Sequence, residues 1–176
     1  MAKGTDGLDR LDLMSKVITR TDGFHNYANT KSTVILTFTT AVLAVFASNL
    51  SKIYEMLACS GLPHVKLVFT LLTGVEFLLL FAALIFISKT LIPNTDKSET
   101  KNIYSFVDIY KNFKIEDYRS EVATIEKDDL IASMCDLQYN LSKSLDGKYN
   151  NHKNAVWCIT SALKLSLILL VILIFA

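Results

Sequence analysis

The sequence predicts an all-α membrane protein with three transmembrane helices, two of which extend into a cytoplasmic helical bundle. Hydrophobic residues make up 51% of the 176 residues, and the mean hydropathy is +0.35, which is too apolar for an ordinary soluble domain of this length. The apolar residues are also concentrated in three windows. Each window is about 20 residues long, which is enough to cross a hydrocarbon core of about 30 Å.

The first element expected is a cytoplasmic amino-terminal helix within residues 1–31, followed by a first transmembrane helix over residues 32–51. The apolar residues before the membrane recur at steps of three and four, which is typical of one helix face: Leu11, Met14, Val17, Ile18 and Phe24. The span itself carries no charge, and no proline separates it from the polar segment that precedes it. We therefore expect one continuous helix from His25 to Thr40, passing from water into lipid.

A short periplasmic loop is expected over residues 52–66, with a turn at Gly61-Leu-Pro63, and a second transmembrane helix over residues 67–92. The Pro93-Asn94 dipeptide ends that helix.

Residues 93–154 form the expected cytoplasmic helical sensor segment, and residues 155–176 the third transmembrane helix. Ile103 to Tyr110 is short and aromatic, and fits either one strand or a helical turn. From Ile115 onward, apolar residues recur along one side of a helix that is expected to continue past Gly147 into the third span. The two cytoplasmic helices with apolar faces are expected to pack as a bundle.

Basic residues set the predicted orientation. They are frequent in residues 1–31 and 93–154, whereas residues 52–66 contain only Lys52 and Lys66. The positive-inside rule then predicts a multi-pass membrane protein with a cytoplasmic amino terminus.

Two ionisable residues lie deep in the spans. Glu76 is about 18 Å and Lys164 about 13 Å from the cytoplasmic ends of their helices, at 1.5 Å per residue. Because a mid-membrane charge costs roughly 2.5 to 3.5 kcal/mol, we hypothesise that Glu76 and Lys164 pair, within one subunit or between subunits. In the alternative, Glu76 is protonated and bonded to a first-span threonine, while Lys164 faces water or snorkels.

Residue patterns for catalysis and metal binding are missing. His25, His64 and His152 are scattered over both sides of the expected membrane, and there is no glycine-rich phosphate loop or nucleophile motif, so an enzyme is not expected. The three cysteines have no metal-ligand spacing, and no cofactor is expected. With a net charge of +1 and basic residues explained by topology, no nucleic-acid partner is expected either.

A collar of cations, amides and hydroxyls marks the cytoplasmic ends of the spans. Membrane lipid headgroups explain some of the lysines, but the accompanying amides suit a small anionic ligand with a planar ring, such as a nucleotide. The candidate ligand-binding residues are Asn29, Lys31, Asn94, Gln138, Ser142, Lys143, Lys148 and Tyr149.

Three short motifs resemble the transmembrane effectors of Pycsar antiphage defence. They are Tyr27-Ala-Asn-Thr-Lys-Ser, the Pro93-Asn stop followed by Ile103-Tyr-Ser-Phe-Val-Asp-Ile, and Asp136-Leu-Gln-Tyr-Asn-Leu-Ser-Lys with Lys148-Tyr149. The sequence departs from the family pattern at Asn29, where Asp is usual, and at Asn94, where Arg is usual.

The resemblance implies a function. A pyrimidine nucleotide cyclase encoded nearby would make cyclic UMP or cyclic CMP on infection, and the effector would bind it and impair or depolarise the inner membrane, causing growth arrest or cell death. A homo-oligomer is expected, because one three-span chain has few polar intramembrane residues.

The alternative is a ligand-independent membrane protein, such as a holin-like toxin or an accessory subunit of a membrane complex. A neighbouring cyclase gene would favour the first function and a lysis or transporter cassette the second.

Overall fold

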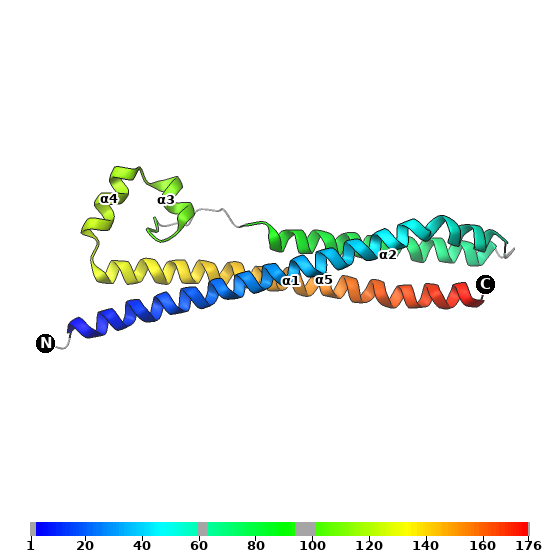
Figure 1. Cartoon of the computed structure of the whole chain (residues 1–176), viewed down its shortest axis with the longest axis horizontal. Helices are drawn as coiled ribbons and strands as arrows, with labels where there is room; N and C mark the ends of the chain where they lie inside the picture. Colours follow the sequence, from blue (N-terminus) through cyan, green and yellow to red (C-terminus); the bar gives the residue numbers. More distant parts are fainter. Residues whose placement is uncertain (1–2, 60–62, 94–100, 176) are drawn as a thin grey trace. The chain divides into compact units, whose positions relative to one another are not determined.

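The computed structural model describes residues 3–59, 63–93 and 101–175, with residues 3–8 and 59 described by their backbone alone. Within these ranges every regular element is an α-helix (Figure 1). Three helices are long and apolar enough to cross a membrane, which confirms the predicted all-α, three-span fold. The helices are α1 (Lys3–Cys59), α2 (Pro63–Leu91), α3 (Phe106–Asn112), α4 (Ile115–Thr124) and α5 (Lys127–Phe175).

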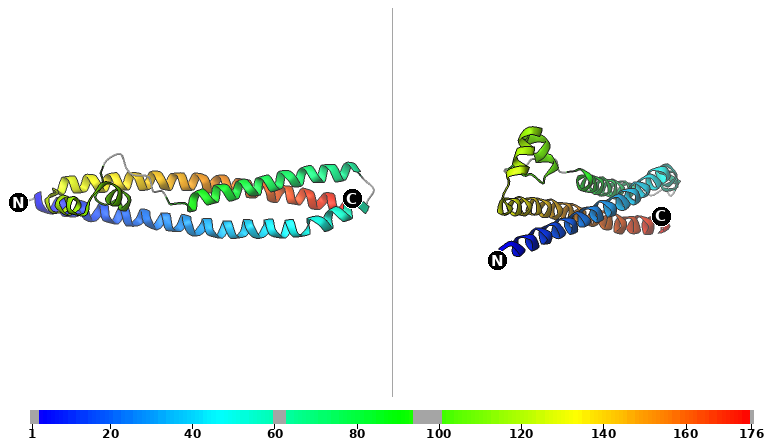
Figure 2. Two further views of the ribbon diagram at one scale, coloured as in Figure 1. Left: turned by 90° about the horizontal axis from the view of Figure 1, so that it is seen from above. Right: turned by 60° about the vertical axis from the view of Figure 1, so that its left-hand side comes forward.

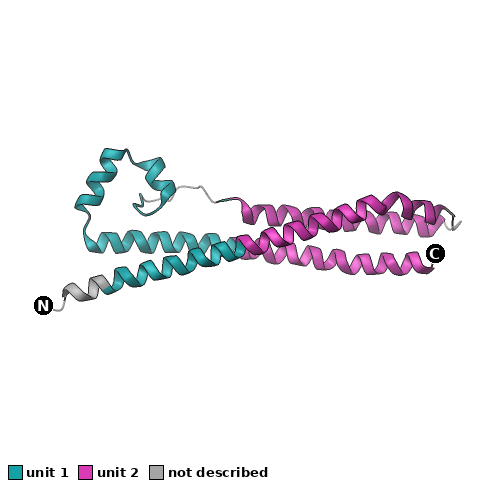
Figure 3. Cartoon of the chain, in the orientation of Figure 1, with its two compact units in different colours: residues 1–28, 93–147 teal, residues 29–92, 148–176 magenta. Residues whose placement is uncertain are grey.

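The chain divides into two compact units, coloured separately in Figure 3. Unit 1 comprises Met1–Ala28 and Pro93–Gly147, and unit 2 comprises Asn29–Ile92 and Lys148–Ala176. Both α1 and α5 contribute residues to each unit as one uninterrupted helix. The helix predicted from His25 to Thr40, and the one predicted to continue past Gly147, are therefore confirmed.

Unit 2 contains the membrane-spanning parts of α1, α2 and α5, which run side by side (Figure 2). One hydrophobic cluster is built on Leu57, Phe69 and Leu169, each from a different helix. A second is built on Ala83, Cys158 and Ile159. Small buried residues such as Ala83 let neighbouring helix backbones approach closely, as is common between helices in a membrane.

Unit 1 contains the short helices α3 and α4 and the polar halves of α1 and α5. The buried Asn102 side chain donates a hydrogen bond to the carbonyl of Ser133 on α5 (2.7 Å) and accepts one from the backbone N–H of Tyr104 (2.8 Å). The Ser105 hydroxyl then caps α3 by accepting from the N–H of Asp108. Of the two structures expected for residues 103–110, the helical turn is the one formed, but it begins only at Phe106.

Two expectations about helix limits need correction. The helix expected from Ile115 onward is broken, because Ile125 takes an extended conformation and closes α4 through its N–H to the carbonyl of Glu121. A new helix, α5, starts at Lys127, and the acidic residues of its first turn suit a helix amino terminus. Helical structure also covers most of residues 52–66, since α2 begins at Pro63, which is well tolerated in a first turn. Gly61 lies outside the described residues.

The apolar face predicted on the amino-terminal half of α1 is mostly correct. Leu11, Met14, Val17 and Ile18 are half-buried. Phe24 is exposed instead, and the Arg20 guanidinium lies 5.6 Å from the centre of its ring.

Candidate functional site

A lysine held by a neutral partner lies at the polar end of unit 2. The Lys148 ammonium on α5 donates a hydrogen bond to Oδ1 of Asn29 on α1, at 2.7 Å, and both side chains are half-buried. No carboxylate forms an ion pair with Lys148 among the residues that the structure describes. Burial lowers the pKa of Lys148, because removing an ammonium from water disfavours its charged form. This contact therefore holds a partly desolvated cation whose charge is not neutralised.

The side chains of Lys31 and His152 belong to the same place as this contact. His152 is half-buried one turn beyond Lys148 on α5. Its pKa lies below 6.5, first because of burial and second because of the nearby positive charge of Lys31. We call Asn29, Lys31, Lys148 and His152 the lysine cluster. Such a concentration of positive charge with amide groups suits an anion that has several hydrogen-bond acceptors.

The sequence predicts three members of this cluster, Asn29, Lys31 and Lys148, as ligand residues, but not His152. The spacing of four residues between Lys148 and His152 is the signal that would have found it, because residues at that separation share a helix face.

The chain matches a known protein family. A family model described as a Pycsar effector protein domain matches residues 13–176, which include the lysine cluster and nearly all of the three long helices. The chain belongs to this family. Neither the curated proteins nor the solved structures contain a match. Membership identifies the chain as a Pycsar effector, a membrane protein of antiphage defence that works in a cyclic-nucleotide signalling context.

In this Pycsar effector, two other predicted ligand residues belong to a polar network within unit 1. Nε2 of Gln138 donates to the hydroxyl of Thr21 (2.8 Å) and to that of Ser142 (3.1 Å). Nearby, Nε2 of His25 is hydrogen-bonded to the carbonyl of Leu141 at 3.0 Å. Oε1 of Gln138 is buried and has no partner among the described residues. The structure thus joins Gln138 to Ser142, and both remain predictions as ligand contacts.

The remaining predicted ligand residues are less constrained. Lys143 and Tyr149 are exposed, and Asn94 lies outside the described residues. A ligand role for each of them stays a prediction. In the described part of the chain, no group of histidine, cysteine or acidic side chains is arranged to hold a metal ion.

Glu76 has a different partner from the two that the sequence suggested. It is fully buried on α2, and its Oε1 is hydrogen-bonded to the hydroxyl of Ser166 on α5. Lys164 is exposed, and no described contact joins it to Glu76, so a pair within one subunit is not formed. No first-span threonine bonds to Glu76 either in the described structure; Thr37, for example, donates back to the carbonyl of Thr33. A pair between subunits stays a prediction.

The reason lies in helix rotation. Counting residues from the membrane surface gives the depth of a side chain but not its direction. Residues two positions apart on an α-helix, such as Lys164 and Ser166, point about 200° apart. Lys164 and Ser166 therefore lie at similar depth, but on opposite sides of α5.

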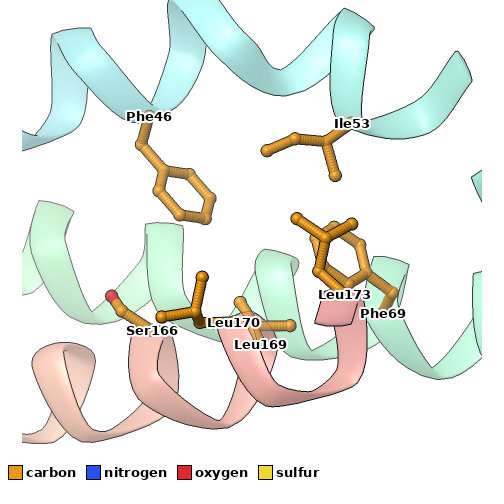
Figure 4. A pocket seen from close by; sticks show the side chains of 7 residues that line it. All are labelled: Phe46, Ile53, Phe69, Ser166, Leu169, Leu170 and Leu173. Atoms are coloured by element: carbon orange, nitrogen blue, oxygen red, sulfur yellow. The ribbon is translucent and has the colours of Figure 1, made fainter. Parts of the chain in front are cut away.

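A recess of about 100 Å³ opens beside Ser166, the hydrogen-bond partner of Glu76 (Figure 4). Its walls are Phe46, Ile53, Phe69, Leu169, Leu170 and Leu173, with Ser166 as its polar member. A nearly apolar recess of this size offers no group to bind a charged nucleotide. The lysine cluster is therefore the better candidate for ligand binding.

Proposed function

We propose that this Pycsar effector binds a cyclic pyrimidine mononucleotide, cyclic UMP or cyclic CMP, on the cytoplasmic side and then impairs or depolarises the inner membrane. Growth arrest or death of the infected cell follows. The observation that supports this most is the contact of Lys148 with Asn29, a half-buried ammonium bound to a neutral amide. A cyclic mononucleotide brings one phosphate charge and several acceptor oxygens to such a group.

The geometry of Lys148 leaves donors for the ligand. An ammonium has three N–H donors, and the Asn29 amide oxygen accepts one of them. Hydrogen bonds between an ammonium and a phosphate oxygen are charge-assisted and about twice as strong as neutral ones. Asn29 also differs from the Asp that is usual in the family motif, so that it orients Lys148 without cancelling its charge.

Binding is coupled to the membrane through the two helices of the lysine cluster. Asn29 precedes the first span on α1, and Lys148 precedes the third span on α5, with no break in either helix. A ligand that favours one arrangement of these helices shifts the equilibrium toward it. A shift from 1:99 to 99:1 requires about 5.5 kcal/mol of differential binding. We infer that several copies of the chain together disrupt the membrane and that no catalysis is involved.

Titration calorimetry of the full chain in detergent tests the ligand. Cyclic UMP, cyclic CMP, cyclic AMP and cyclic GMP are titrated separately under the same conditions. The proposal expects a pyrimidine nucleotide to bind and the purine nucleotides to bind more weakly. Absence of binding by all four would overturn it.

A further inference from the structure

We propose that Glu76 and Ser166, with Thr73, form a proton-binding site inside the membrane, and that protons are the ions this effector carries across it. That nucleotide binding triggers this transport rests on the proposed function. The inference goes beyond that function by naming the ion and the side chain that binds it.

In the described part of the chain, Glu76 is isolated from water and from any countercharge. Its side chain is 0% exposed. The spans over residues 32–51 and 67–88 contain no other charged residue, and Lys164 on α5 is exposed without contacting it. A buried carboxylate with no cationic partner is strongly disfavoured in an apolar surrounding, whereas a neutral carboxylic acid is tolerated. The surroundings of Glu76 therefore favour a bound proton.

The number of protons available for hydrogen bonds also favours a protonated Glu76. The Ser166 hydroxyl has one proton but lies within hydrogen-bonding reach of two acceptors, Oε1 of Glu76 and the carbonyl of Ala162 (3.2 Å). If Glu76 were ionised, only one of these acceptors would receive that proton. If Glu76 is protonated, its O–H donates to the Ser166 oxygen, and Ser166 donates to Ala162. Both bonds are then satisfied.

Two buried side-chain oxygens on α2 still lack hydrogen-bond partners in the described structure. Oε2 of Glu76 and the hydroxyl of Thr73 are both buried, and neither has a hydrogen-bond partner among the described residues. Thr73 is only 3% exposed and precedes Glu76 by three residues, so the two share one side of α2. Two unpartnered buried oxygens on one side of the helix leave hydrogen-bonding capacity that a transferred proton can use. They provide a place from which a proton reaches Glu76 or leaves it.

Apolar and buried side chains flank the site along the spans in the described conformation. On one side the recess of Figure 4 reaches Ser166, and its apolar lining disfavours water. On the other side, the buried Thr90 hydroxyl donates to Ser32 at 2.7 Å, at the end of unit 2 nearer the lysine cluster. Ala83 and Ile87, both 0% exposed, lie on α2 between Glu76 and Thr90. Proton passage thus requires the helices to rearrange, which is the change attributed to the nucleotide.

Flux measurements on the full chain test whether protons are the ions that cross the membrane. The protein is reconstituted in phosphatidylethanolamine and phosphatidylglycerol vesicles that contain a proton-sensitive or a potassium-sensitive dye, and cyclic UMP or cyclic CMP is added. We expect proton flux without matching potassium flux. Glu76→Gln should lower the proton flux at least tenfold while calorimetric nucleotide binding is unchanged. Thr40→Val, an exposed α1 position whose hydroxyl bonds back to Leu36, serves as the control and should leave the flux unchanged. Equal potassium flux, or undiminished proton flux in Glu76→Gln, would overturn the inference.

Infrared spectroscopy tests the bound proton without any nucleotide. The wild-type spectrum minus the Glu76→Gln spectrum at neutral pH should contain the carbonyl band of a protonated carboxylic acid, and Ser166→Ala should shift that band. Absence of the band overturns the proton site. A chain that shows the band but binds no nucleotide contradicts the proposed function and keeps the site, so the two failures are distinguishable.

Discussion

Lys148 and Glu76 are two ionisable residues with neutral hydrogen-bond partners, but their surroundings lead to opposite charge states. Lys148 is half-buried at the polar end of unit 2, where an amide oxygen orients its ammonium. Glu76 is fully buried in the middle of the spans, where a serine hydroxyl is its partner. Lys148 can still reach water, so its neutral partner leaves it charged. Glu76 cannot reach water, so a neutral partner favours its protonated, uncharged form. In the two proposals above, Lys148 therefore recognises the ligand and Glu76 binds the proton.

The largest effect is expected from removing the charge of the lysine cluster. Lys148→Ala should weaken nucleotide binding by about 1.5 to 3 kcal/mol, because a charge-assisted hydrogen bond to the phosphate is lost. Calorimetry measures this, with the exposed Lys153→Ala on the same helix as the matched control. Equal affinity in Lys148→Ala and the wild type would reassign Lys148 to lipid headgroups.

The next largest effect is a loss of folding stability when the hydrogen bond to Glu76 is removed. Ser166→Ala should lower the free energy of unfolding by about 1 to 2 kcal/mol, since a hydrogen bond between membrane helices disappears and a buried carboxyl group is left without its partner. Chemical unfolding in detergent gives the value. Ser161→Ala is the control, because the half-buried Ser161 makes no hydrogen bond in the described structure. If both variants lose equal stability, the bond between Ser166 and Glu76 contributes nothing specific.

Asn29→Asp tests whether the partner of Lys148 must be neutral. The new carboxylate would form an ion pair with Lys148 and repel the phosphate, so nucleotide affinity should fall about fivefold, or ~1 kcal/mol. Asn29→Gln keeps a neutral amide and should bind more tightly than Asn29→Asp. Tighter binding by Asn29→Asp would show that the charge of Lys148 is not used for the ligand.

The smallest effect concerns the pH dependence of stability. The pKa of His152 lies below 6.5 in the folded chain, so the unfolded chain binds more protons there and the free energy of unfolding should fall as the pH falls below about 6.5. Unfolding curves at several pH values, compared between the wild type and His152→Asn, isolate this contribution. Lys31→Met should reduce it, because the Lys31 charge is its second cause. The same slope in His152→Asn would assign the pH dependence to other groups.

Features that depend on long stretches of sequence were predictable. The three spans follow from apolar windows, and the continuity of α1 and α5 follows from the absence of proline near Lys31 and after Gly147. Asn29 and Lys148 were both selected as collar residues because each is a polar side chain just outside a span. The structure adds that the two side chains are hydrogen-bonded to each other.

Features that depend on helix rotation or on a single backbone conformation were not predictable. Ser166 was missed because depth counting does not show which side of α5 faces Glu76. The break at Ile125 was missed because the apolar spacing continues through it, although the backbone there is extended. The side-chain partners of Gln138 likewise depend on how α1 and α5 are turned within unit 1.

Membrane potential in reconstituted vesicles tests the central claim most directly. The full chain is placed in vesicles that carry a potassium diffusion potential and a voltage-sensitive dye, with nucleotide on both sides of the membrane. Cyclic UMP or cyclic CMP should collapse the potential across wild-type vesicles, and Lys148→Ala should need at least tenfold more nucleotide for the same effect, since each 1.4 kcal/mol is a factor of ten. A potential that collapses equally without nucleotide, or equally in wild type and Lys148→Ala, would contradict a nucleotide-controlled effector that senses its ligand through the lysine cluster.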